Sequence, residues 1–71
     1  MNNATPFQQL TLRVTSSYEG GEAQTSTERR SVELSQELSQ DFLTELAEQT
    51  SGFWDVLSVE LVDSYTSHFN S

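Results

Sequence analysis

The chain has 71 residues, with eleven acidic and three basic side chains, and its formal net charge is −8. A chain of this length forms one domain with a thin core, and the absence of Cys excludes disulfides and thiolate metal sites. The acidic surplus argues against direct binding to nucleic-acid phosphates or to an anionic membrane surface. It favours a partner with a basic surface, or solubility alone.

The first predicted element is a strand. Residues 1–6 are polar and end in the only Pro, so we expect a flexible lead-in. From Leu10 the residues alternate between apolar and polar, which is typical of a half-buried strand. One face carries Leu10, Leu12, Val14 and Tyr18. Gly20 and Gly21 follow it and indicate a hairpin turn.

The second predicted strand lies in residues 23–34 and is mostly polar, with Val32 and Leu34 as its apolar residues. A two-residue turn at Gly20 and Gly21 would point both side chains away from the core. We therefore expect a longer loop or a bulge that shifts the register by one residue. The polar character predicts an edge strand.

Residues 34–52 change to a helical period. Leu38, Phe42 and Leu46 recur every four residues and form one apolar stripe. Ser35 and Ser39 are both candidate N-caps. Gly52 is a natural residue to end the helix, and we expect Phe53 to make the hydrophobic contact that accompanies such an end.

Residues 53–65 return to a strand. Its predicted core face carries Phe53, Leu57, Val59 and Leu61, and its other face carries Trp54, Val56, Glu60 and Val62. Residues 66–71 show no pattern and are expected to be a flexible tail, which leaves residues 7–65 as the domain.

The order of elements predicts the fold. Two strands joined by a hairpin are antiparallel, and a right-handed crossover through the helix sets the third strand beside the first. We therefore expect an α+β domain of ββαβ topology, in which one helix packs on one face of a three-stranded antiparallel sheet of order 2-1-3. Leu12, Leu46 and Val59 should meet beneath the helix.

The wet face of the predicted helix is acidic throughout. Glu37, Asp41 and Glu45 form a row with about 6 Å of helix rise between successive charges, and Glu48 extends it. Like charges at this spacing destabilise a helix slightly. The row is either a solvated face or a site for a partner with a basic groove, where it would mimic a nucleic-acid strand.

The second candidate site is the sheet face that no helix covers. Trp54 and Val56 are expected on this face with Arg13, and an exposed Trp among apolar side chains indicates an interface. Arg13 is expected to contact either the ring of Trp54 or the carboxylate of Glu60.

No catalytic, cofactor or metal motif is present, and the lone His68 lies near the end of the chain. We therefore expect a non-enzymatic, cytoplasmic protein that binds a basic protein surface, with no small-molecule substrate. Inhibition of a nucleic-acid-handling enzyme is the sharpest version. The alternative is a structural homodimer or assembly subunit that pairs through the open sheet face. In size, charge and layout the chain is similar, as a class, to the small inhibitor proteins that bacteriophages encode, although no motif carries this likeness.

Overall fold

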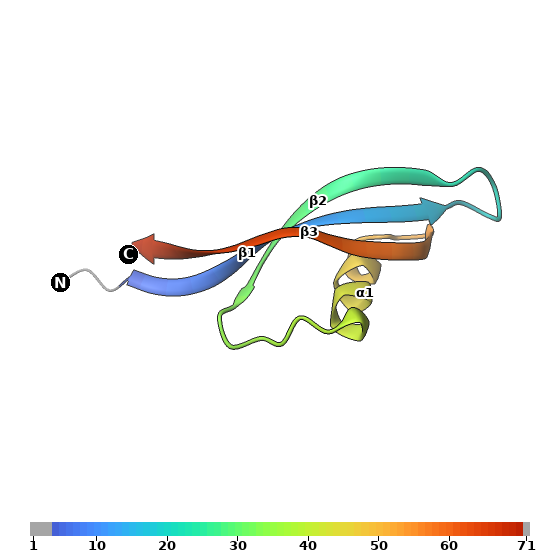
Figure 1. The fold of residues 1–71 in the computed structure, drawn as a ribbon. Coiled ribbons are helices and arrows are strands. Elements are labelled where there is room, and N and C mark those ends of the chain that lie inside the picture. The colour runs from blue at the N-terminus through green and yellow to red at the C-terminus, as the bar shows by residue number, and fades with distance from the viewer. Residues whose placement is uncertain (1–3, 71) are drawn as a thin grey trace.

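The computed structural model describes residues 4–70 and has the predicted ββαβ order (Figure 1). The three strands are β1 (Ala4–Ser17), β2 (Gln24–Glu33) and β3 (Asp55–Asn70), and the helix is α1 (Gln40–Gln49). They form one antiparallel sheet of order β2-β1-β3. The predicted fold class and strand order are confirmed.

β1 is the central strand, and its alternating side chains build the floor of the core. Leu10, Leu12 and Val14 are each at most 3% exposed, because they all point to the side of the sheet that α1 covers. Arg13, between two of them, points to the opposite face and is exposed. The alternation of β1 therefore separates a buried face from a solvent-exposed face, as the sequence predicts.

The hairpin shifts the register of β2 as expected. Gly21 N donates to Tyr18 O at 2.9 Å, so the tight turn is centred on Glu19 and Gly20, which both have positive φ. The ladder then begins at Ser16 opposite Gln24 and keeps one register to Phe7 opposite Glu33. In this register Val32 lies on the helix side and packs against the core.

β3 departs from the predicted alternation because it contains two bulges. Its pairing with β1 shifts between Thr11 and Leu12 and again between Thr15 and Ser16, which leaves Val62 and Leu57 without partners. Each extra residue reverses the facing of the residues that follow it. As a result Val56, Val59 and Leu61 all lie on the helix side.

Three side-chain placements in this region are therefore corrected. Val56 was expected on the open face, but the bulge at Leu57 turns it toward the core. Leu57 and Phe53 were expected in the core, but they are 57% and 90% exposed. Phe53 lies in the turn before β3, where Trp54 N donates to Ser51 O, and it makes no buried contact at the end of the helix.

α1 is shorter than the apolar stripe predicts. Of the two candidate caps, Ser39 is the N-cap: its Oγ accepts from Phe42 N at 3.2 Å, and Ser35 lies in the preceding turn. Leu38, directly before the cap, still packs against the core, as the N′ residue of a hydrophobic staple does. The helix ends at Gln49, and Gly52 takes a positive φ in the turn that leads to β3.

α1 is bonded to both edge strands. At its start Gln40 Nε2 donates to the carbonyl of Val59 in β3 at 3.0 Å. At its end Thr50 Oγ1 accepts from Arg30 Nη2, and the same nitrogen donates to Glu28 Oε1 at 2.7 Å, both in β2. The helix therefore spans the sheet from one edge to the other and is held at each end by a side chain.

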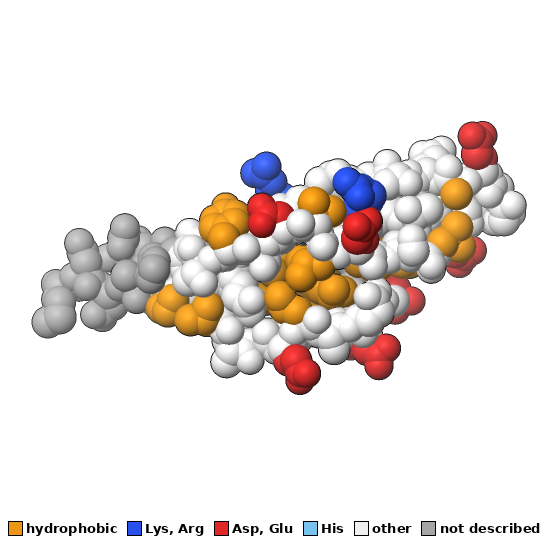
Figure 2. Space-filling model, viewed as in Figure 1, with side chains coloured by type: hydrophobic (Ala, Val, Ile, Leu, Met, Phe, Trp, Pro, Cys, Tyr) orange, Lys and Arg blue, Asp and Glu red, His pale blue; other side chains and the backbone are white. Residues whose placement is uncertain are grey.

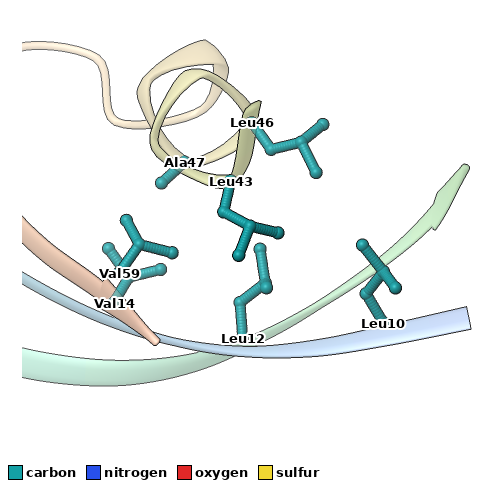
Figure 3. Close-up of a cluster of buried hydrophobic side chains, with 7 residues drawn as sticks. All are labelled: Leu10, Leu12, Val14, Leu43, Leu46, Ala47 and Val59. Atoms are coloured by element: carbon teal, nitrogen blue, oxygen red, sulfur yellow. The ribbon is translucent and has the colours of Figure 1, made fainter. Parts of the chain in front are cut away.

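The core lies between α1 and the sheet (Figure 3). Leu43 points from the helix toward Leu12, with Leu46 on one side of it and Ala47 on the other, above Val59. The expected meeting of Leu12, Leu46 and Val59 beneath the helix is confirmed. Among residues 6–67 the buried hydrophobic residues are Leu10, Leu12, Val14, Leu43, Leu46, Ala47 and Val59.

The molecule is elongated because two strands extend past the helix (Figure 1). Its extents are 52 × 20 × 15 Å and its radius of gyration is 14.2 Å, whereas a compact chain of this length has about 11 Å. β1 begins at Ala4 and β3 ends at Asn70, so the strands pass the predicted limits of 7 and 65. Residues 1–3 of the predicted lead-in and residue 71 of the predicted tail lie outside the described residues.

Candidate functional site: the acidic surface of the helix

The exposed side of α1 carries three carboxylates. Asp41, Glu45 and Glu48 are all exposed, while Leu43, Leu46 and Ala47 are buried on the opposite side. The spacings of four and three residues place neighbouring carboxylates on one helix face, with about 6 Å and 4.5 Å of rise between them. The predicted row on the wet face is therefore present over these three residues.

Glu37 is not a helical residue, which corrects its predicted place in the row. The helix begins only after the Ser39 cap, so Glu37 lies in the connection between β2 and α1, where it is exposed. This connection is fixed to the sheet at its start. Gln8 Nε2 lies within 3.0–3.2 Å of the carbonyl oxygens of Glu33, Leu34 and Gln36. We call Glu37, Asp41, Glu45 and Glu48 together the acidic surface.

The acidic surface has no cation of its own. Among the side chains of residues 6–67 the two ion pairs are Arg13–Glu60, at 3.0 Å, and Arg30–Glu28, at 2.7 Å. Both pairs join sheet residues, and Arg29, the third basic residue, is also in β2. No Arg or Lys occurs between residues 31 and 71, so the whole acidic surface comes from a segment without a positive side chain.

The charge separation is visible on the molecular surface (Figure 2). In this view the basic side chains lie along the edge of the sheet opposite the helix, each with acidic neighbours. Where α1 and the connection before it lie, the charged side chains in this view are all acidic. None of these carboxylates has an ion-pair partner among residues 6–67, so no ion pair neutralises their charge.

The open face of the sheet is polar over β1 and β2, whereas β3 adds the exposed side chains of Tyr65, opposite Gln9, and Val62. Its β1 and β2 positions are largely Thr, Ser and Gln, with hydrogen bonds between Thr15 and Thr25 and between Ser31 and Gln9. Arg13 Nη1 donates to Glu60 Oε1 at 3.0 Å. Of its two predicted contacts, Arg13 therefore makes the one with Glu60.

Trp54 lies at one end of the sheet and not on its open face. It precedes β3, is 36% exposed, and packs against Tyr18 beside the β1–β2 turn with ring centroids 5.6 Å apart. The exposed side chains of Phe53 and Leu57 belong to the same part of the chain. The structure therefore does not bring Trp54, Val56 and Arg13 together as the single site that the sequence predicts.

The chemistry that the described residues offer is charge and hydrogen bonding. Across residues 6–67 no three His, Cys, Asp or Glu side chains gather in a way that could hold a metal ion. The same part of the chain encloses no pocket. It also contains no helix long and apolar enough to cross a membrane.

Comparisons of the chain with known protein families, curated proteins and solved structures found no match. The function therefore has to be argued from the described residues themselves.

Sequence reasoning missed the charge pattern of β2. Glu28 and Arg30 are two residues apart, so they share the helix side of the strand and bond to each other there. Arg29, Ser31 and Glu33 share the opposite face and are exposed. The period of two separates the helix-side residues of β2 from its open-face residues. The charges alone indicate only the solubility of an edge strand.

Proposed function

We propose that this is a small acidic, non-enzymatic binding protein that occupies a basic surface of a larger macromolecule in the cytoplasm. Its sharpest form is an inhibitor of a nucleic-acid-handling enzyme, in the manner of those that bacteriophages encode. The observation that carries the proposal is the acidic surface, whose carboxylates form no ion pair among residues 6–67, while both ion pairs lie on the sheet.

The energetic cost of this arrangement supports a role in binding. Like charges at i,i+4 destabilise a helix by a few tenths of a kcal/mol per pair, and Asp41 and Glu45 have that spacing. Glu48 adds to the cost because it stands in the last helical turn, where the helix dipole favours a cation. Glu45→Lys would relieve the repulsion with Asp41, and Glu48→Lys would relieve the contact with the helix dipole. Both side chains are exposed, so neither change enters the core.

The geometry fits a surface that binds phosphates. Three carboxylates on a helix only ten residues long form a short, straight row of anions, and a groove that binds nucleic acid carries a matching row of cations. The same charges, with a net charge of −8, disfavour direct contact with nucleic acid. The partner is therefore a protein whose basic surface both the acidic surface and a nucleic acid can occupy.

Self-association through the open sheet face has less support. The β1 and β2 positions of that face are polar, Val56 packs against the core on the other side, and Trp54 lies at the end of the sheet. Trp54 and Val56, the apolar side chains that this alternative requires on one face, therefore do not form one interface.

The test is capture of a partner from a lysate of the source cell by the wild-type protein and two charge-matched variants. Glu45→Lys/Glu48→Lys alters the acidic surface. Glu19→Lys/Glu22→Lys makes the same change in net charge at the exposed hairpin. We expect the helix variant to lose a partner that the hairpin variant retains, and added DNA or RNA to displace that partner. Equal capture by both variants, or no displacement by nucleic acid, contradicts the proposal.

A further inference from the structure

The two edge strands of the sheet are not equally open to another strand. β3 carries two bulges and three acidic side chains, and Gln40 of α1 already binds the carbonyl of Val59. Bulges and a covering element block strand addition, whereas charged side chains occur on both edge strands and do not distinguish them. β2 pairs with β1 in a single register over its whole length, so its outer edge keeps the regular geometry that another strand can extend.

The backbone of β2 directs alternate residues outward. In an antiparallel ladder each residue directs both its N–H and its C=O to the same side. The carbonyl of Arg29 accepts from Arg30 Nη1 at 3.2 Å, so it faces away from β1. Thr27, Arg29 and Ser31 therefore direct their hydrogen-bonding groups to the outer edge of the sheet. An arriving strand would replace the solvent-exposed Arg30 contact at Arg29, whereas the carbonyl of Glu33 already accepts from Gln36 N and Gln8 Nε2.

The side chains of these residues are complementary to a second copy of themselves. Arg29, Ser31 and Glu33 are exposed on the open face, and neither Arg29 nor Glu33 belongs to the ion pairs of residues 4–70. A two-fold axis at Ser31 makes an antiparallel pair in which each Arg29 lies opposite the Glu33 of the other copy. Moving the axis to residue 29 or 30 sets Arg opposite Arg, which is unfavourable.

We propose that two copies of the chain pair antiparallel along β2, with Ser31 opposite Ser31, to form a continuous six-stranded sheet. The occupant of this edge is a second copy because β2 offers both signs of charge at the spacing that a two-fold interface requires. An acidic segment like β3 would meet Arg29 but would repel Glu33. This inference does not depend on the proposed function of the acidic surface.

Charge exchange on the purified full chain tests the pairing. Arg29→Glu and Glu33→Arg each place like charges opposite each other twice, so we expect each single variant to be monomeric in sedimentation velocity. The double variant Arg29→Glu/Glu33→Arg restores both pairs and should be a dimer like the wild type. An equimolar mixture of the two single variants should also form a dimer, because each supplies the charge that the other lacks.

A cross-link tests the register. The chain has no Cys, so Ser31→Cys introduces one thiol, and residues paired across an antiparallel ladder lie about 4.5–5.5 Å apart, within the span of a disulfide. We expect Ser31→Cys to oxidise to a covalent dimer and the control Thr27→Cys to stay reduced. A wild type that stays monomeric at every concentration overturns the proposal, as does a dimer that both single charge variants retain.

Discussion

The two charged regions of this molecule, β2 and the acidic surface, treat neighbouring charges in opposite ways. In β2 Glu28 bonds to Arg30 at 2.7 Å, and Arg29 and Glu33, four residues apart, lie on one exposed face. On α1 the carboxylates follow one another along one exposed face. All three Arg residues belong to the sheet, and Arg30, which reaches the end of α1 through Thr50, forms its ion pair with Glu28. The acidic surface therefore depends on where the charges lie and not on overall composition alone.

The largest expected effect comes from separating α1 from the sheet, because the acidic surface exists only while the helix is docked. Leu46 is 8% exposed beneath the helix. Leu46→Ala should lower the free energy of unfolding by about 2–5 kcal/mol, the usual range for a buried Leu. Urea denaturation measures it. Leu34→Ala is the control because Leu34 is 45% exposed, and it should cost far less. Equal losses in both variants would contradict the packing of α1.

A smaller effect should follow from the helix cap, which decides that Glu37 lies outside the helical row. Ser39→Ala removes the Oγ that accepts from Phe42 N and should cost about 1 kcal/mol of stability. Ser35→Ala, at the other predicted cap, should be nearly neutral. The two thermal midpoints distinguish the positions. A greater loss at Ser35 would put the helix start, and Glu37 with it, back in the predicted row.

The smallest effect concerns the ion pairs that make β2 unlike α1. A double-mutant cycle with Glu28→Ala and Arg30→Ala should give a coupling energy near the upper end of the range for surface pairs, about 1 kcal/mol. These side chains are 24–26% exposed and also bind Thr50. The Arg13–Glu60 pair is 50–65% exposed, so its cycle should give a smaller coupling that salt removes more readily. The reverse order would mean that the Arg30 network does not hold the end of α1.

The parts of the fold that the sequence predicts are those with a period. Alternation in β1 and the four-residue repeat of Leu38, Phe42 and Leu46 were enough to predict ββαβ, the strand order and the core beneath the helix. The bulges at Leu57 and Val62 were not predictable in this way, because an inserted residue leaves no mark in the composition. The bulge at Leu57 is the reason that Val56 faces the core and not the open side of the sheet that alternation predicts. Ser35 and Ser39 are the same residue type, so the sequence did not decide between them.

The candidate site divides in the same way. Asp41, Glu45 and Glu48 were predicted because their spacing and the apolar stripe identify the wet face of the helix. The placement of Trp54 with Arg13 was wrong, because it depended on the register of a strand that starts only at Asp55. The period of two shows which β2 residues share a face, but only the register shows that Arg29, Ser31 and Glu33 are on the open one.

The central claim is that the acidic surface serves binding at a cost in stability. The most direct test is to measure melting and partner affinity on the same protein, Glu45→Lys/Glu48→Lys, beside Glu19→Lys/Glu22→Lys. The account predicts that the helix variant gains a few tenths of a kcal/mol of stability, because repulsion and an unfavourable dipole contact are both relieved, while it loses the captured partner. The hairpin variant should keep the partner. A helix variant that binds as tightly as the wild type would contradict the claim.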